Sequence, residues 1–402
     1  MKIAGIVAEY NPFHKGHLHL IQSIRDRVGA CRADAVVVVM SGNFVQRGEP
    51  ALLSKAERAK MAVKAGADLV LELPTPYVLS SAEGFARGAV GILDALGCVD
   101  VLCFGSEAAD ETALRRAADV METARFTELM KYFMEGGISY PAARQKALGE
   151  IAGQKAAALL NGANNVLGIE YLRVLAKRNS KMDVFTIPRI GAEHDALTPI
   201  GDIASASYIR RLVREGRLAN IAPYMNVAGY AVLSSAHAAG VCPSDVRLIE
   251  RAVLAKLRLM TADDIRRTTA ASEGLENRFL NAIKQAQDLE QLIALTKTKR
   301  YPQTRIQRMI WSAFLGIPAP LSQSELPPYV RMLAVGDKGH DILNIARNGP
   351  LPLVARASQF ERMDDTAKQW FEIECRASDL YSLTLPKPPA CGQEYTYAIA
   401  HP

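Results

Sequence analysis

The chain has 402 residues, of which 49% are hydrophobic and 22% are charged. Both proportions are near the average for globular proteins, so they exclude a disordered chain, a collagen-like repeat and a disulfide scaffold. At about 100 to 200 residues per domain, the length predicts two or three domains. The sequence holds no apolar run of the roughly 18 to 20 residues that a membrane span needs, and no signal-peptide pattern follows Met1. We therefore expect a packed cytosolic protein.

The cysteine pattern and the charge balance further limit the kinds of site and partner that the protein can have. The cysteines form neither a C-x-x-C pair nor a Cys/His quartet, so they predict neither structural zinc nor a thioredoxin-type motif. We expect free thiols in a reducing compartment, at Cys31, Cys98, Cys103, Cys242, Cys375 and Cys391. Lys and Arg number 48 against 42 Asp and Glu, a net charge of +6. This excess permits a polyanionic partner without requiring one.

The chain up to about residue 216 alternates short apolar runs with amphipathic segments. Continuous apolar or β-branched runs are typical of strands that helices cover on both faces. We therefore predict a mostly parallel sheet of βαβ units, with strands over 2–8, 35–40, 68–73, 100–104 and 182–187. A helix after the first strand is predicted by apolar residues at helical spacing, Leu18, Ile21, Ile24 and Val28. A capping-box pattern at 54–57 begins a second helix.

Near residue 216 the strand signals stop. The rest of the chain predicts helices over 245–259, 261–271, 278–286, 289–296, 305–315 and 364–383. Pro223 favours a boundary within 216–224, so we predict two domains, 1–216 and 217–402. Four prolines between 318 and 328 predict a stiff connection inside the helical half, and the segment from Pro386 is predicted to lack regular structure.

The most informative segment is Asn11-Pro12-Phe13-His14-Lys15-Gly16-His17, directly after the first predicted strand. In an open α/β sheet, ligands bind beyond the carboxyl ends of strands, where helix N–H groups and the helix dipole favour an anion. His14 and His17 are three residues apart, so both rings can face one side of the first helical turn. Oriented donors on a phosphate are typically worth about 2.7 to 4 kcal/mol each in a transition state. We therefore predict a triphosphate site with His14 and His17 as catalytic residues.

An arbitrary histidine pair at this spacing is usually a solvated surface or half a metal site. Its place after a buried strand favours catalysis, and the motif resembles the nucleotidyltransferase superfamily that shares its fold with class I aminoacyl-tRNA synthetases. Members attack the α-phosphate of ATP and release pyrophosphate. A second phosphate motif of that superfamily is matched at 204–210, where Ser205, Ser207 and Arg210 suit the β- and γ-phosphates, although a serine at a helix start is also an ordinary N-cap. Walker and Gly-x-Gly-x-x-Gly loops are lacking, which disfavours P-loop and nicotinamide chemistry.

Further segments narrow the resemblance, at 6–17, 40–50, 104–107, 164–171, 188–192 and 299–308. Together they resemble the bacterial tRNA(Met) cytidine acetate ligase family over almost the whole chain. The resemblance implies a Rossmann-like nucleotidyltransferase domain in which acetate and ATP form acetyl-adenylate. The acetyl group then passes to N4 of the wobble cytidine of elongator tRNA(Met). Two positions depart from the family pattern, since Ser207 stands where Thr is usual and Tyr208 where a small residue is usual.

The resemblance also implies an ATP-binding set. Its members are Val7, Ala8, Glu9, Tyr10, Asn11, Pro12, Phe13, His14, Lys15, Gly16, His17, Leu18, His19, Leu20, Gly105, Asn164 and Arg189. A side chain at Gly105 would obstruct the nucleotide, Asn164 both donates and accepts hydrogen bonds, and Arg189 is a permanent cation. The simpler interpretations of these three are a turn glycine, a helix N-cap and a solvated Arg. Mg²⁺ is inferred from the leaving pyrophosphate.

A basic stretch in the second half suggests where RNA binds. Residues 296–311 hold five cations and no acid, with Tyr301 and Trp311 among them; the cations are Lys297, Lys299, Arg300, Arg305 and Arg308. Charge runs are usually solvated faces, but cations beside aromatic residues suit RNA phosphates and unstacked anticodon bases. A second basic run follows the phosphate motif, at Arg210, Arg211, Arg214 and Arg217.

These observations predict an ATP-dependent acetate ligase that acts on elongator tRNA(Met). One alternative is an adenylyltransferase that joins AMP to a small phosphorylated cofactor precursor, because the core motifs do not distinguish an attacking carboxylate from a phosphate. Another is a non-catalytic RNA-binding protein that retains a nucleotide fold. The basic helical half argues against the first, and the intact His14 and His17 argue against the second.

Overall fold

The computed structural model describes residues 1–26, 32–189, 198–199, 201–268, 274–347 and 349–402. Its centre is a seven-stranded sheet with the order β7-β6-β1-β2-β5-β8-β9. The strands are β1 (Ile3–Ala8), β2 (Ala35–Ser41), β5 (Leu69–Leu73), β6 (Val101–Ser106), β7 (Asp183–Pro188), β8 (Val330–Val335) and β9 (Leu353–Val354). The pairs from β7 to β5 are parallel, and β8 runs antiparallel to β5. The predicted α/β class with a mostly parallel sheet is confirmed.

The five predicted strands are all present, each within two residues of its expected bounds. The run at 35–40 becomes β2 at the middle of the sheet, where every residue is buried. A two-stranded hairpin that the sequence did not predict, β3 (Phe44–Val45) and β4 (Glu49–Pro50), follows β2 directly. This hairpin extends from the carboxyl edge of the sheet, next to the end of β1.

The prediction that strands end near residue 216 is wrong. Strand β8, with every residue buried, comes from the second half and pairs with β5, and β9 pairs with β8. The prolines before it and Arg331, its second residue, obscure the strand in the sequence, because the charge of Arg331 meets its partner Glu394 only in the folded chain. The second half therefore shares the sheet with the first. The division at residue 216 stays a prediction, and Pro223 there lies inside a 3₁₀ helix, Leu218–Tyr224.

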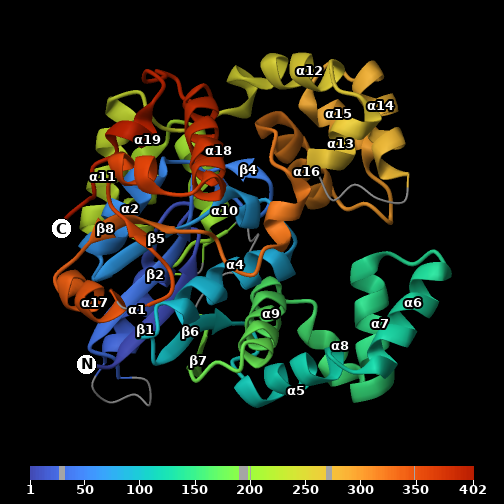
Figure 1. The fold of residues 1–402 in the computed structure, drawn as a ribbon, viewed down its shortest axis with the longest axis horizontal. Helices are drawn as coiled ribbons and strands as arrows, with labels where there is room; N and C mark the ends of the chain where they lie inside the picture. Colours follow the sequence, from blue (N-terminus) through green and yellow to red (C-terminus); the bar gives the residue numbers. More distant parts are fainter. Residues whose placement is uncertain (27–31, 190–197, 200, 269–273, 348) are drawn as a thin grey trace.

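The helices surround the sheet and form two groups beside it (Figure 1). Those up to residue 214 are α1 (Lys15–Arg25), α2 (Lys55–Lys64), α3 (Thr75–Val78), α4 (Ala82–Ala95), α5 (Glu111–Met121), α6 (Ala124–Glu135), α7 (Tyr140–Ala152), α8 (Gln154–Leu159), α9 (Ala163–Lys177) and α10 (Ala206–Arg214). The later ones are α11 (Val227–Ala238), α12 (Glu250–Arg258), α13 (Ala262–Thr268), α14 (Leu275–Gln285), α15 (Leu289–Thr296), α16 (Gln303–Leu315), α17 (Gly339–Ala346), α18 (Asp365–Ser382) and α19 (Gln393–Thr396).

The predicted helices of the second half are confirmed within a few residues, and α15 has the expected bounds. The ends of two predicted helices, at Val28 and at 269–271, lie outside the described residues. Figure 1 shows α5–α8 as one group beside the sheet and α12–α16 as another, with α9 between the first group and the sheet. Within the described ranges, no helix has the length and apolar character to cross a membrane.

A buried cluster of charges joins the two halves of the chain. Lys55 Nζ lies 2.7 Å from Glu72 Oε1 and 2.6 Å from Glu394 Oε1, and all three side chains are at most 3% exposed. Arg331 Nη1 lies 3.1 Å from Glu394 Oε2 without the alignment of a hydrogen bond, and its Nη2 donates to the Glu394 carbonyl at 2.7 Å. Burial raises the pKa of the Glu394 carboxyl, but the charges of Lys55 and Arg331 lower it by more, so the pKa lies below its ordinary value.

This cluster corrects the prediction that the segment from Pro386 lacks regular structure. Glu394 lies in the short helix α19, and the Ala400 N–H donates to the Leu333 carbonyl of β8 at 3.1 Å. The prolines before α19 gave no sign of this docking. It depends on a carboxylate that meets Lys55 and Arg331 from distant parts of the chain.

We expect Glu394→Ala to destabilise the protein by about 3 to 5 kcal/mol, because it leaves two buried cations short of a counter-charge. The matched control is Glu128→Ala, which breaks the exposed pair with Arg125, where both side chains are at least 66% exposed, and should cost no more than about 1 kcal/mol. Urea denaturation followed by circular dichroism measures both. Equal losses in the two variants would contradict the role given to the cluster.

Candidate active site

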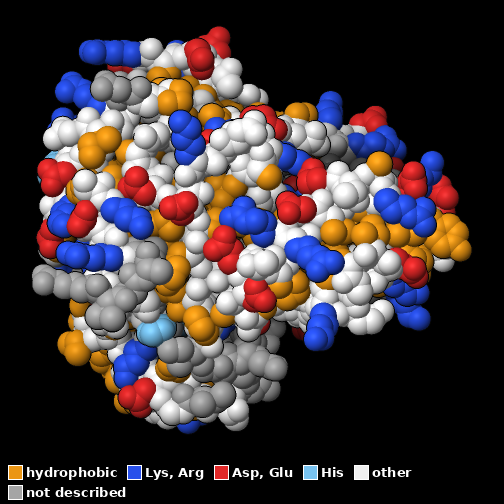
Figure 2. All heavy atoms as spheres, turned by 90° about the horizontal axis from the view of Figure 1, so that it is seen from below, with side chains coloured by type: hydrophobic (Ala, Val, Ile, Leu, Met, Phe, Trp, Pro, Cys, Tyr) orange, Lys and Arg blue, Asp and Glu red, His pale blue; other side chains and the backbone are white. Residues whose placement is uncertain are grey.

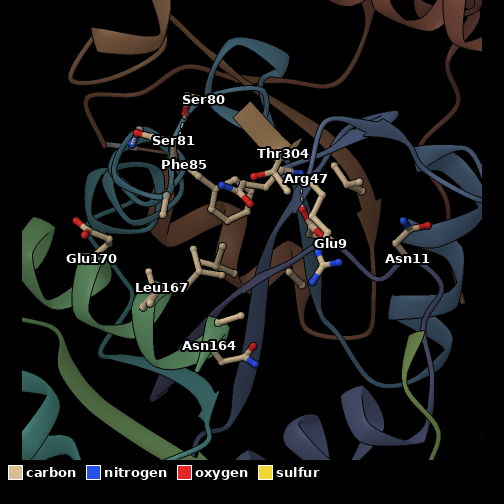
Figure 3. A pocket seen from close by; sticks show the side chains of 18 of the residues that line it. Glu9, Asn11, Arg47, Ser80, Ser81, Phe85, Asn164, Leu167, Glu170 and Thr304 are labelled. Carbon is tan, nitrogen blue, oxygen red and sulfur yellow. Dashed lines mark hydrogen bonds between the residues drawn. The ribbon is translucent and has the colours of Figure 1, made fainter. Parts of the chain in front are cut away.

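A cavity of about 980 Å³ lies at the carboxyl ends of β1, β6 and β7. Figure 3 shows labelled residues on opposite sides of it: Glu9, Arg47 and Thr304 on one side, and Asn164, Leu167 and Glu170 on the other. Thr304 comes from α16, so both halves of the chain line the same cavity. Its volume is in the range of ligand sites.

The turn after β1 directs side chains into this cavity. Tyr10 has a φ of +48°, in the left-handed region that few non-glycine residues occupy. A hydrogen bond fixes the turn to the segment before α2, since Asn11 Oδ1 accepts from the Leu52 N–H at 2.7 Å. Backbone conformations of this kind often occur at functional sites.

His14 and His17 stand at the N-terminus of α1. The Nδ1 of His14 accepts from the Gly16 N–H at 3.0 Å, and the Nδ1 of His17 accepts from the His14 N–H at 3.2 Å. The rings stack with centroids 3.8 Å apart, which confirms that both face one side of the first turn. Because each Nδ1 accepts, a neutral ring carries its proton on Nε2. Both histidines therefore offer N–H donors at a helix N-terminus that favours an anion.

Most of the predicted ATP-binding residues line the cavity. They are Val7, Ala8, Glu9, Tyr10, Asn11, His14, Gly16, His17, His19, Leu20, Gly105, Asn164, Arg189, Ser205 and Arg210. Five do not, namely Pro12, Phe13, Lys15, Leu18 and Ser207. Phe13 is fully buried in the core, and Lys15 pairs with Asp202 at 3.1 Å. The roles of the whole set stay predictions.

Asn164 and Arg189 lie close to one carboxylate, that of Glu107. It accepts hydrogen bonds from the Asn164 side chain at 2.6 Å and from the Asn165 N–H at 2.8 Å, at the start of α9. Burial raises the pKa of Glu107, but these hydrogen bonds lower it more. Burial lowers the pKa of Arg189, which Glu107 opposes. Gly162 is the N-cap of α9 and Asn164 lies in the first turn, so the interpretation of Asn164 as a helix N-cap is wrong.

In the second phosphate motif, Ser205 is the N-cap of α10 and accepts from the Tyr208 N–H at 3.0 Å. The ordinary interpretation of this serine is therefore correct, and the residue still lines the cavity. Arg210 donates to the Asn11 carbonyl at 2.7 Å and to Ser207 Oγ at 3.0 Å. These contacts hold the motif against the histidine loop.

The basic stretch of the second half is divided by the fold. Arg300, Arg305 and Arg308 line the cavity, whereas Lys297 and Lys299 are exposed outside it. Arg308 Nη1 donates to the Gln46 carbonyl at 3.2 Å, and burial lowers its pKa to about 10. The cavity therefore collects cations from both halves, and such cations suit phosphate groups.

Close packing between α16 and the β3–β4 hairpin makes this arrangement possible. Gly48 has a φ of +80°, and a Cβ at this position would lie 2.5 Å from the Arg308 backbone nitrogen. Only glycine allows both the turn and the contact. Gln46 and Arg47 also line the cavity and were not predicted from the sequence. Their signal was available, because the 40–50 segment follows β2 at the same edge of the sheet as the histidine loop.

One face of the molecule carries charges of both signs. On the face in Figure 2, Lys and Arg side chains alternate with Asp and Glu. The net positive charge is thus not gathered among the described residues on that face. Likewise, no group of three His, Cys, Asp or Glu side chains in the described part of the chain has the arrangement to hold a metal ion.

Comparisons with known proteins agree with this geometry. The model of the HIGH Nucleotidyl Transferase family matches residues 1–395. A tRNA(Met) cytidine acetate ligase of Acetivibrio thermocellus is 38% identical, with 99% of each chain covered, and one of Alkaliphilus metalliredigens is 37% identical, with 96% of this chain and 95% of the relative covered. This chain belongs to the tRNA(Met) cytidine acetate ligase family. The resemblance inferred from the sequence is confirmed.

Solved structures match the chain over its full length. The apo structure of TmcAL from Thermotoga maritima aligns with a TM-score of 0.94 at 31% identity, covering 100% of both chains. A second structure of the Thermotoga maritima protein, bound with alpha-thio ATP, aligns with a TM-score of 0.92 at 30% identity over the same coverage. These matches favour neither the adenylyltransferase nor the non-catalytic alternative, because the relatives that match over the full length are named as acetate ligases.

Proposed function

We propose that this chain joins acetate to the α-phosphate of ATP and then passes the acetyl group to N4 of the wobble cytidine of elongator tRNA(Met). As a family member it is an ATP-dependent tRNA(Met) cytidine acetate ligase. The observation that carries the proposal is the full-length family match, together with a cavity in which paired histidine donors meet cations from both halves.

In the first step, an acetate oxygen attacks the α-phosphorus, and the bond to the pyrophosphate oxygen breaks. Negative charge grows on the α-phosphate oxygens during this attack. The Nε2–H groups of His14 and His17 stabilise it as fixed donors at the start of α1. Free acetate is a poor acyl donor, and adenylation converts one of its oxygens into part of a good leaving group.

In the second step, the wobble base must leave the anticodon stack and enter the cavity, because its amine has to reach the acyl carbon. The exposed Lys297 and Lys299 stand next to the lining residue Arg300. We assign the five cations of 297–308 to tRNA phosphates, with Lys297 and Lys299 outside the cavity and Arg300, Arg305 and Arg308 at its wall.

We propose that Mg²⁺ binds together with ATP. It would neutralise the leaving pyrophosphate. The described residues include no metal cage, and Mg²⁺ commonly binds through substrate phosphates with few protein ligands. No step is assigned here to protein-bound metal.

The proposed function is tested by incubation with labelled acetate, ATP, Mg²⁺ and tRNA(Met). The wobble cytidine should become labelled, and AMP and pyrophosphate should appear in equal amounts. Acetyl-CoA without ATP serves as the control donor, because an enzyme that uses a thioester needs no adenylate. Labelling from acetyl-CoA alone, or release of ADP, would contradict the proposal.

The paired histidines are tested by acetate-dependent ATP–pyrophosphate exchange. His14→Asn and His17→Asn keep an acceptor near the Nδ1 position but lose the Nε2–H donor, so each should lower exchange by about 10² to 10³. His14→Ala should also lose the cap on the Gly16 N–H, at about 0.5 to 2 kcal/mol. Normal exchange in a folded double Asn variant would remove the catalytic assignment.

The RNA contacts are tested by the salt dependence of tRNA binding. Lys297→Ala and Lys299→Ala should each reduce the slope of log affinity against log salt by about 0.7 to 0.9, since each phosphate contact releases counterions. Lys284→Ala, an exposed lysine on α14, is the matched control. An unchanged slope in the 297 and 299 variants would move the tRNA interface elsewhere.

A further inference from the structure

The second half-reaction needs a proton acceptor, and the cavity offers few. As the cytidine N4 amine attacks the acyl carbon, it must lose a proton. His14 and His17 are unsuited to accept it, because their Nδ1 atoms already accept backbone N–H groups and neutral rings carry the proton on Nε2. The acceptor is therefore to be sought among the carboxylates that line the cavity, which are Glu9, Glu49, Glu83 and Glu170.

Two of these carboxylates are already paired with cations. Glu170 pairs with Arg144 and Arg173, and its side chain is 2% exposed. Glu83 lies 3.2 Å from Arg87 Nη2. Glu49 has no printed partner that fixes its carboxylate among the described residues, and both Glu49 and Glu9 oppose the lowering of the Arg210 pKa by burial.

Glu9 differs from these three in its geometry. Its Oε1 accepts a hydrogen bond from the Gln46 N–H at 2.6 Å. Among the described residues, Oε2 has no hydrogen-bond partner, and Glu9 is half-buried. Glu9 lines the cavity directly after β1, and Figure 3 shows it beside Arg47 and Thr304. One oxygen is thus fixed, and the other is open to a ligand.

The backbone of Glu9 is fixed as well. Its carbonyl accepts a hydrogen bond from Arg58, whose side chain is fully buried. The next residue, Tyr10, takes the left-handed conformation that turns the chain toward Asn11. A base must be held within hydrogen-bond reach of its proton, and these contacts provide that rigidity.

We propose that Glu9 is the general base of acetyl transfer, which rests on the proposed function above. As the N4–carbon bond forms, the bond from the acyl carbon to the adenylate oxygen breaks, and AMP leaves with the electron pair. The amine proton passes to Oε2 of Glu9. Atoms and charge balance without a further reactant.

The surroundings of Glu9 suit this role. Burial raises its pKa above the ordinary value, against the lowering effects of the Gln46 hydrogen bond and of Arg58, Arg210 and Arg47. Tyr171 on α9 lines the same cavity, and burial and the Glu9 charge together raise the pKa of Tyr171. A carboxylate with a raised pKa is a stronger base, and it loses activity as the pH falls through that pKa. The transfer rate should therefore decline on the acid side.

The experiment separates the two half-reactions of the full-length enzyme. Single-turnover transfer from enzyme-bound acetyl-adenylate to tRNA(Met) is measured against pH, beside acetate-dependent ATP–pyrophosphate exchange. Glu9→Gln keeps an oxygen for the Gln46 N–H, so the turn is retained. It should lower transfer by about 10² to 10⁴ and abolish the acid-side decline, while exchange falls far less. Glu83→Gln, a paired glutamate in the same cavity, should keep the wild-type pH profile.

Glu9→Asp is a second variant that retains a carboxylate, so it separates loss of the base from misfolding. It should transfer slowly but preserve the acid-side decline. Equal losses of exchange and transfer in Glu9→Gln, or an unchanged acid-side decline, would overturn the assignment. If the wild-type enzyme itself showed no acetate-dependent exchange, the proposed function would fail instead, so the two failures are distinguishable.

Discussion

The buried guanidinium of Arg58 is the contact on which the site depends. It donates to the carbonyls of Glu9, Gly42 and Leu53, which come from three loops at the carboxyl edge of the sheet. Burial lowers the pKa of Arg58 to about 10, and the carbonyls offset part of the cost of removing the charge from water. One side chain thereby fixes the ends of β1 and β2, from which the histidine loop and the β3–β4 hairpin emerge.

A second set of buried charges brings the other half of the chain to this edge. Lys55, on the same helix as Arg58, meets Glu72 and Glu394, and Arg331 of β8 completes the cluster. Buried ion pairs add little net stability but are costly to break, so they favour one arrangement of the chain. With β8 in the sheet and Gly48 against α16, the cations of the second half reach a cavity built mainly by the first.

The patterns that predicted correctly were local ones. The continuous apolar run at 35–40 predicts a buried strand by its composition alone. The histidine loop directly follows a predicted strand in the sequence, so its place at the end of that strand was also predictable. Strand β8 and the docking of Glu394 were missed because their stability comes from partners far along the chain. For the same reason the 40–50 segment was noticed as a family motif without a role for Gln46 or Arg47.

By itself, the sequence determined the fold class, the family and the paired histidines, because each rests on neighbouring residues and short spacings. Only the tertiary structure decided that Glu9 lines the cavity with one carboxylate oxygen fixed, since Gln46 supplies the N–H from another loop. It also decided that Arg300, Arg305 and Arg308 join the nucleotide cavity while Lys297 and Lys299 stay outside. A run of cations in a sequence does not show which side chains line a cavity and which are exposed, because that depends on how the segment packs.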